Sequence, residues 1–206
     1  MKVFWVPKLP VSNLLEEGRE IVNLILLGPP GAGKGTQAEK IASFFSLTHI
    51  STGELFRQEV SKKTSLGMQA KGFMDRGELV PDEIVLAMIQ SVISESQNGF
   101  LLDGFPRNVE QAKALGTMLG SQNLRIDHVL SLEVPEDVIV ERMVSRGRSD
   151  DHPDTIKNRL SVYREQTQPV KEFYAEQGLV HEVNGSQKVD TVFDSICQLL
   201  PKGGVQ

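Results

Sequence analysis

A glycine-rich segment near residue 30 carries the clearest chemical signal in the sequence. Between an apolar run and an amphipathic stretch the chain reads Gly-Pro-Pro-Gly-Ala-Gly-Lys-Gly-Thr, residues 28–36. Glycines let a backbone fold tightly enough for several N–H groups to point at one anion, and the positive end of a following helix strengthens the attraction. Lys34 is placed to reach the outer phosphates of a ligand. We interpret the segment as a phosphate-binding loop rather than a plain strand-to-helix turn.

The loop departs from the general phosphate-binding motif at one position. Gly35 follows Lys34 where the motif has Ser or Thr, and Thr36 comes one place later. This spacing narrows the range of proteins that the loop can belong to.

A second candidate site begins where an apolar run ends in a carboxylate. Phe100–Leu102 is followed by Asp103, and the C-terminal edge of a parallel sheet is where such an acid can lie beside Mg²⁺. Because magnesium usually keeps several waters, we expect Asp103 to act through water; a helix-capping aspartate is the plainer alternative. Gly104 permits close approach of a substrate, and Arg107 offers a planar fork to two phosphate oxygens.

Arginines concentrate in one short span of the chain. They are Arg142, Arg146, Arg148 and Arg159. The first two are four residues apart and share a helix face. In a net-acidic protein this cluster indicates a local phosphate site, although Glu141, Asp150 and Asp151 could instead form ordinary surface pairs.

The elements that must position these residues follow from the apolar pattern. Runs suited to buried parallel strands are Ile21–Leu27, Leu47–Ile50, Phe100–Leu102, His128–Glu133 and Leu179–Val183. Helical patterns lie between them, so we predict an α/β fold.

Four helical regions can be placed within this alternation. They begin near Gly35, begin at Pro135, run from Asp154 to Gln177 with a kink at Pro169, and fill residues 53–93 as a small helical insertion. The insertion region shows no convincing strand pattern.

Composition bounds the class of protein. The chain has 206 residues, 39% of them hydrophobic and 24% charged, and a net charge of −5, which fits one soluble globular unit. Its charge gives no global attraction to nucleic acid or anionic lipid, and apolar runs such as Val3–Val6 are too short to span a membrane. The single Cys197 fits a reducing compartment. We therefore expect a cytoplasmic protein without nucleic-acid or membrane partners.

Two further regions yield weaker expectations. His49, His128, His152 and His181 are scattered without metal-ligand spacing, so we expect surface or core histidines and no structural zinc. Ser12 or Asn13 could cap a short helix through Leu14, Leu15 and Ile21, as part of a surface appendage.

Taken together, the motifs resemble those of the adenylate kinases, in the nucleoside monophosphate kinase family. The likeness covers about residues 22–200. It rests on Gly28 to Gln37, Ile50-Ser51-Thr52-Gly53 with Arg57, Leu79-Val80-Pro81-Asp82, Leu102 to Arg107 with Gln111, Arg146 to Asp151, and Arg159.

The resemblance implies a fold and its division. It implies a P-loop NTPase-type, five-stranded parallel sheet flanked by helices, in a single domain over 22–206. A helical insertion at about 51–80 would bind the nucleoside monophosphate, and a short lid would cover about 146–152. Residues 1–21 would be an N-terminal extension without an assigned role.

An acceptor site for AMP also follows from the likeness. In relatives the Thr52 position lies by the adenine, the Arg57 position clamps the phosphate, and Gln111 contacts the base edge. Met74 would line the same pocket or belong to the core. The implied AMP-binding set is Thr52, Arg57, Glu78, Leu79, Val80, Gly104, Phe105, Pro106, Arg107, Gln111, Arg148 and Arg159.

For ATP, the implied set is Gly31, Ala32, Gly33, Lys34, Gly35, Thr36, Arg146 and Gln187. The catalytic residues implied are Lys34, Arg107, Arg146, Arg148 and Arg159, with Asp103 on the Mg²⁺ side. Asp150 or Asp151 would position the lid arginines, whose individual roles depend on where the gap in the short lid is placed.

The activity implied is reversible phosphoryl transfer from MgATP to AMP, giving two ADP, by a monomer that serves adenine nucleotide homeostasis and salvage. A UMP/CMP kinase is the nearest alternative and is disfavoured by Thr52 and Gln111. A nucleotide-binding switch is a second alternative, but the sequence has no Asn-Lys-x-Asp guanine motif. A purely structural protein would have no reason to combine the loop with Asp-Gly-Phe-Pro-Arg.

Overall fold

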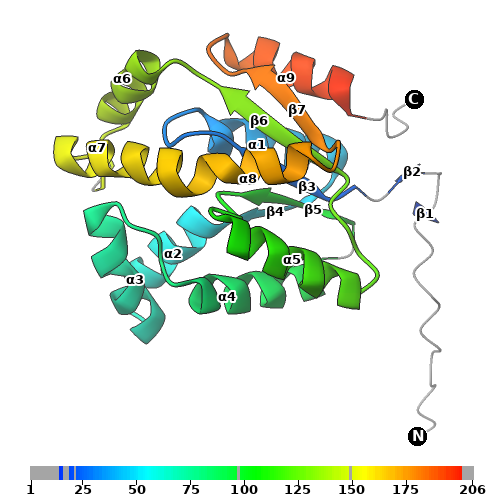
Figure 1. The fold of residues 1–206 in the computed structure, drawn as a ribbon, viewed down its shortest axis with the longest axis horizontal. Coiled ribbons are helices and arrows are strands. Elements are labelled where there is room, and N and C mark those ends of the chain that lie inside the picture. Colours follow the sequence, from blue (N-terminus) through cyan, green and yellow to red (C-terminus); the bar gives the residue numbers. More distant parts are fainter. Residues whose placement is uncertain (1–13, 16–18, 21, 97, 149, 201–206) are drawn as a thin grey trace, which may run out of the picture.

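A parallel β-sheet organises the molecule (Figure 1). The computed structural model describes residues 14–15, 19–20, 22–96, 98–148 and 150–200. Five strands pair in parallel in the order β4-β5-β3-β6-β7. Their bounds are β3 Leu24–Leu27, β4 Thr48–Ser51, β5 Phe100–Asp103, β6 His128–Glu133 and β7 Val180–Asn184. The predicted α/β class and five-stranded parallel sheet are confirmed.

Alternating side chains of the strands build two separate cores. On one face of the sheet, Leu24 and Leu26 of β3 pack with α1 (Lys34–Phe45) and α9 (Val189–Leu199). On the other face, Ile25 and Leu27 pack with helices from the middle of the chain. Because both faces are covered, the strands read as continuous apolar runs, which is the pattern that predicted them.

Three helices connect β4 to β5. They are α2 (Thr52–Ser61), α3 (Ser65–Arg76) and α4 (Asp82–Glu95), and residues 53–93 contain no strand. Thr64 caps α3 by accepting a hydrogen bond from the Gly67 backbone N–H at 3.0 Å, and Gly77 ends this helix with φ of 73°. The predicted helical insertion is therefore present, and α5 (Val109–Ser121) follows β5.

The long helical stretch after the arginine cluster is not one regular helix. α7 (Pro153–Val162) passes through a π-helical turn, η1 (Tyr163–Thr167), into α8 (Gln168–Ala175). Pro169 has no N–H to donate to the preceding turn, so the α-helical ladder cannot run through it unchanged. The interruption predicted at Pro169 takes the form of this π turn.

A short connection separates α6 (Glu136–Arg146) from α7. Gly147 ends α6 in the left-handed region with φ of 62°. Ile139 and Met143 of α6 pack against Ile156 and Leu160 of α7 in a small core of their own. This packing holds the two helices, and the arginines they carry, side by side.

The helix predicted near the N-terminus is wrong where it can be compared. β1 (Leu14–Leu15) and β2 (Arg19–Glu20) pair antiparallel, with Leu14 opposite Glu20. The intervening sequence contains Gly18, which disfavours a helix through this segment. Ser12, Asn13 and Ile21 lie outside the described residues. No helix in the described part of the chain is long and apolar enough to cross a membrane.

Candidate active site

A cavity of about 580 Å³ opens at the carboxyl edge of the sheet. This volume lies in the range of small-molecule sites. Its basic lining consists of Lys34, Arg57, Arg107, Arg142, Arg146, Arg148 and Arg159. Asp103, at the end of β5, is among the few acidic groups that also line it. The structure thus brings all five predicted catalytic residues, together with Asp103, to one cavity.

Positive-φ glycines shape the loop that borders this cavity. Gly28, Gly31 and Gly33 have φ of 143°, 86° and 94°. A Cβ on Gly31 would lie 2.8 Å from the Met143 Cγ and 2.9 Å from the Ile139 carbonyl oxygen. The loop therefore needs glycine both for its backbone angles and for its contact with α6.

Lys34 is the first residue of α1, and its ammonium folds back over the loop. Its Nζ donates to the carbonyl oxygens of Gly28 at 2.7 Å and Pro29 at 2.9 Å. Burial lowers the pKa of Lys34 to about 8; Asp103 raises this pKa, and neighbouring arginines lower it further. An anion bound in the loop would favour the charged ammonium.

Asp103 sits within a small polar group at the ends of β4 and β5. Ser51 Oγ donates to its Oδ2 at 3.2 Å, and His49 Nε2 lies 3.7 Å from the same oxygen, beyond hydrogen-bond range. Burial raises the pKa of Asp103, but His49 and Lys34 outweigh it, and the pKa is lowered overall. The carboxylate is therefore ionised and directed at the cavity.

Arg107 is fixed through its side chain and through both of its backbone groups. Its Nε donates to the Gly104 carbonyl at 2.7 Å, its backbone N–H donates to Gln111 Oε1 at 2.7 Å, and its carbonyl accepts from Thr167 Oγ1 at 2.8 Å. Burial lowers the pKa of Arg107, yet a guanidinium stays charged in proteins. Thr167 closes the π turn, so that turn reaches the centre of the site.

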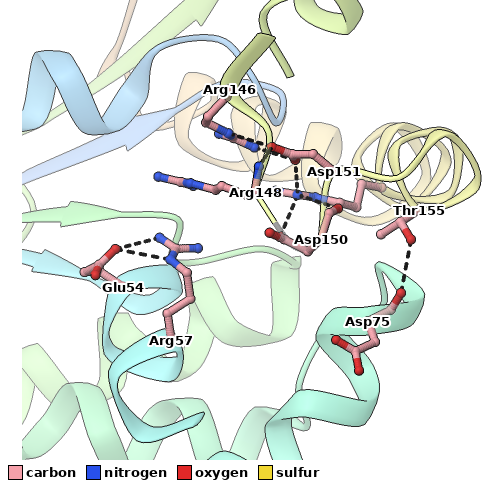
Figure 2. Close-up of polar contacts among 9 residues, drawn as sticks. Glu54, Arg57, Asp75, Arg146, Arg148, Asp150, Asp151 and Thr155 are labelled. Carbon is pink, nitrogen blue, oxygen red and sulfur yellow. Dashed lines mark hydrogen bonds and ion pairs between the residues drawn. The ribbon is translucent and has the colours of Figure 1, made fainter. Parts of the chain in front are cut away.

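Two aspartates organise the arginines of α6 and α7 (Figure 2). Asp151 accepts two hydrogen bonds from Arg146, at 2.7 and 2.9 Å, and one from Arg159 at 3.2 Å. Asp150 accepts from Arg159 Nη1 at 2.8 Å. Burial raises the pKa of Asp151, but the hydrogen bond from Arg146 outweighs it and the pKa is lowered. Both predicted candidates for this positioning role contact the arginines.

Arg148 and Arg57 approach the cavity from opposite sides. The Arg148 backbone N–H donates to Asp151 at 3.2 Å while its side chain extends away from that carboxylate (Figure 2). Across the cavity, Arg57 of α2 pairs with Glu54 at 2.9 Å. Burial lowers the pKa of Arg148, and Arg57 lowers it further. Phosphate groups between the two arginines would relieve this repulsion.

A smaller cavity adjoins the first and takes in the predicted base-binding residues. It is lined by Thr52, Met74, Glu78, Leu79, Val80, Gly104, Arg107 and Gln111 among others. Thr52 is 3% exposed, and its Oγ1 donates to the Gly104 carbonyl at 2.9 Å. The predicted AMP residues thus converge here, with three exceptions: Arg148 lines the first cavity instead, and Phe105 and Pro106 lie elsewhere. Phe105 is fully buried in the core, and Pro106 lines a third cavity beneath the loop.

The remaining loop residues assigned to ATP lie on the first cavity. These are Gly31, Ala32, Gly33, Gly35, Thr36 and Gln187. Nearby, Arg142 Nη1 donates to the carbonyl oxygens of Gly185 at 3.0 Å and Ala32 at 3.4 Å. The sequence predicts Arg142 as a member of the arginine cluster; it lines this cavity and also ties the loop to the segment after β7.

Some site residues carried no usable sequence signal. Thr167 lies 60 residues from its partner Arg107, and His49 meets Asp103 only through strand pairing. Outside the site, at the amino-terminal starts of β6 and β7, His128 and His181 face each other with ring nitrogens 3.0 Å apart, although no spacing in the sequence pairs them. Within the described residues no group of three or more His, Cys, Asp or Glu side chains is arranged to hold a metal ion.

Asp151→Asn should loosen the hold on Arg146 and Arg159 without unfolding the protein. An asparagine offers one acceptor oxygen in place of two, so the bidentate contact with Arg146 is lost. We expect kcat to fall about tenfold, which steady-state rates would measure. Asp154→Asn, an exposed change at the start of α7, is the matched control. Equal rates for the two variants would contradict a positioning role for Asp151.

Comparison with known proteins points to one protein family. An adenylate kinase family model matches residues 26–179. The adenylate kinase of Enterococcus faecalis is 42% identical over 213 residues, covering 87% of this chain and 99% of that protein. The adenylate kinase of Corynebacterium urealyticum is 48% identical, covering 86% and 99%. Adenylate kinase 1 of Synechocystis is 47% identical, covering 86% and 96%.

Proposed function

This chain belongs to the adenylate kinase family and transfers a phosphoryl group reversibly between ATP and AMP, and we propose that the basic cavity is where the transfer takes place. One observation carries the assignment of the site. Lys34 of α1, Arg107 of the loop after β5 and Arg159 of α7 line a single cavity with Asp103. A phosphoryl group between two nucleotides needs positive charge from several directions, and this cavity supplies it.

On the ATP side, the loop from Gly28 to Thr36 holds the donor phosphates through its backbone N–H groups. Lys34 exchanges the Gly28 and Pro29 carbonyls for phosphate oxygens, because a charged acceptor binds an ammonium more strongly than a neutral one. Gln187 borders the adenine of ATP, and Arg146 contacts its phosphates.

On the AMP side, Arg57 and Arg107 clamp the acceptor phosphate. Arg57 leaves Glu54 to do so, and Arg107 already lines the cavity from the loop between β5 and α5. The base enters the smaller cavity, where Thr52 and Gln111 face it and residues 78–80 border it. Arg148 and Arg159 complete the charge around the transferred group.

The residues present fit a magnesium ion that arrives with ATP. Mg²⁺ is usually held by one or two carboxylates together with waters and substrate phosphates, and Asp103 supplies one buried, ionised carboxylate. Ser51 donates to that carboxylate and orients it. When bound, the ion neutralises charge on the donor phosphates. Asp103 would hold it through water.

The reaction needs no general base. The acceptor is a phosphate whose second pKa is near 6, so its attacking oxygen is already anionic at neutral pH. The protein's task is to bring two polyanions together, align them and exclude water. The guanidinium groups around the cavity perform the first two tasks.

The third task, the exclusion of water, would be performed by closure of two segments of the chain over the cavity. We assign residues 51–80 as the acceptor-binding insertion and 146–152 as the lid, because Arg57 and Arg148 reach the cavity from these two sides. Thr155 Oγ1 donates to the Asp75 carbonyl at 3.1 Å (Figure 2) and Asn158 Nδ2 to that of Arg76. These bonds join the end of the insertion to α7, which carries Arg159.

The proposal includes a cytoplasmic monomer with an N-terminal extension over 1–21. The single cysteine and the nucleotide substrates support the compartment. The charged residues assigned to the two nucleotides all belong to this chain, so the proposed site needs no residue from a second copy, which supports the monomer. Light scattering after size exclusion would test the latter, and a dimer mass would contradict it.

Acceptor choice tests the proposed function directly. ADP formation from MgATP would be measured with AMP, UMP, CMP or GMP at equal concentration, beside a reaction without acceptor. We expect strong preference for AMP and little ADP in the control. Preference for UMP or CMP would overturn the base-site assignment, and binding without transfer would overturn the assignment of the cavity as catalytic.

The pKa of Lys34 predicts how activity depends on pH. Because this pKa is about 8 in the nucleotide-free protein, kcat/KM for ATP should fall about tenfold per pH unit above pH 8, as the ammonium loses its proton. Bound phosphates raise this pKa, so kcat should hold to higher pH. Lys34→Arg carries a permanent charge, so its residual kcat/KM should not fall above pH 8. A fall near pH 8 in this variant would show that another group causes the pH dependence.

A further inference from the structure

Asp82 is a charged residue that none of the roles above uses. It is the first residue of α4 and lies half-buried against the start of α5. Its Oδ1 accepts from Gln111 Nε2 at 2.6 Å, and its carboxylate accepts from Asn108 Nδ2 at 3.1 and 3.2 Å. Asn108 Oδ1 in turn accepts from the Gln111 backbone N–H at 2.7 Å. Gln111 of α5 and Asn108, which caps the start of α5, are thus tied to one carboxylate of α4.

These contacts leave the Gln111 side-chain amide one orientation. Its Oε1 accepts from the Arg107 backbone N–H, which can only donate, and its Nε2 donates to the Asp82 carboxylate, which can only accept when ionised. Rotating the amide by half a turn would set donor against donor at Arg107 and acceptor against acceptor at Asp82. With Gln111 only 1% exposed, water cannot replace both lost bonds.

An amide held in one orientation can pair with only one arrangement of donor and acceptor on the edge of a base. Each amide end keeps unused capacity: a second N–H on Nε2 and a second lone pair on Oε1. Adenine presents an N6 amino donor beside the N1 acceptor, which matches one donor and one acceptor in fixed places. Hypoxanthine has the same two rings, but its O6 accepts and its N1–H donates. Only a rotated amide would match that reversed edge.

We propose that Asp82 is a positioning residue that sets base selectivity by locking the Gln111 amide in the orientation that reads adenine. The inference rests on the proposed function, in which Gln111 contacts the base of AMP. The Arg107 backbone N–H is the second half of the lock, so the residue that clamps the phosphate also orients the residue that reads the base.

The test is the ratio of kcat/KM for AMP to that for IMP. Asp82→Leu keeps the branched shape but removes both acceptors, and we expect the ratio to fall about tenfold, since correct pairing at a base edge gives discrimination of that order. Asp82→Asn keeps one oxygen that can accept from Gln111 and should retain most of the ratio. Glu83→Leu, exposed in the same turn of α4, is the matched control and should leave the ratio unchanged.

A purely structural role would give a different result. Asp82→Leu would then lower kcat/KM for AMP and IMP by the same factor, and the unchanged ratio would overturn the inference. Should Asp82→Leu not fold, Asp82→Ala removes the same acceptors without added bulk. Gln111→Ala separates the two proposals: if its ratio equals that of the unaltered protein, Gln111 does not read the base and the proposed base site fails. If its ratio falls while that of Asp82→Leu does not, only the inference on Asp82 fails.

Discussion

Arg107→Ala is expected to lower kcat by about 10³-fold while leaving the protein folded. In the proposed site the guanidinium clamps the acceptor phosphate beside the transferred phosphoryl group, and loss of an arginine that stabilises charge there costs on the order of 10³ or more in rate. Much of what fixes this segment is backbone: the N–H donates to Gln111 and the carbonyl accepts from Thr167, and alanine keeps both bonds. Steady-state rates with AMP and thermal unfolding without nucleotide would measure the two effects.

Two further variants help to interpret the loss of activity in Arg107→Ala: one tests charge against geometry and the other is a control. Arg107→Lys keeps the charge but not the planar fork that binds two phosphate oxygens, so we expect activity nearer to the alanine variant than to the unaltered protein. Arg125→Ala removes an arginine whose side chain is 87% exposed, and should be neutral. Near-normal turnover of Arg107→Ala would remove this residue from the mechanism.

The central sheet could be predicted because burial on both faces leaves a simple signature. β3, β5 and β6 pack against helices on each side, so Leu24 to Leu27 is apolar without interruption. The π turn could not be predicted in the same way. Pro169 indicates an interruption, but its form depends on how α7 and α8 pack, and that packing involves residues far away in the sequence.

In the candidate site, too, some residues could be predicted from the sequence and others could not. Local motifs such as residues 28–36 and Asp103 to Arg107 can be predicted, because a tight turn or a strand end within the motif fixes where the side chains point. The partners of those residues come from elsewhere. Thr167 reaches Arg107 across 60 residues and Asp82 reaches Gln111 across 29. No local pattern pairs either residue with its partner, although Asp82 belongs to a motif that carries the family resemblance.

The N-terminal error has another physical origin. Leu14, Leu15 and Ile21 fit one helical face, but a helix this short is marginal unless it packs on something. The pairing of β1 with β2 gives backbone groups partners without any helical nucleus. Apolar spacing alone cannot distinguish these outcomes over so few residues.

Lys34→Met is expected to abolish most phosphoryl transfer and, at neutral pH, to make the nucleotide-free protein more stable. The lost ammonium is the charge nearest the loop, so kcat should fall about 10²- to 10³-fold. Stability should rise because burial lowers the pKa of Lys34 to about 8, which means that folding disfavours its charged form. We expect a gain of about 1–3 kcal/mol in the free energy of unfolding, measured by urea denaturation.

The sign of this gain gives the prediction its pH dependence. Below pH 8 lysine is charged in both the folded and the unfolded protein, and the unaltered protein bears the whole cost of burying it. Between pH 8 and about 10.5 the folded protein releases the proton while the unfolded chain keeps it, so the unaltered protein becomes more stable relative to Lys34→Met. The stability difference should therefore shrink across this range.

Lys40→Met, on the same helix, provides the contrast. Lys40 pairs with Asp190 and lies over the Phe193 ring at 5.1 Å from its centroid, so its removal should cost stability and leave transfer intact. A Lys34→Met variant less stable than the unaltered protein at pH 7 would show that the bonds to Gly28 and Pro29 outweigh desolvation. The greater stability that we expect instead would mean that the loop holds an unfavourable charge until phosphate arrives, and that part of the binding energy of ATP goes to relieving it.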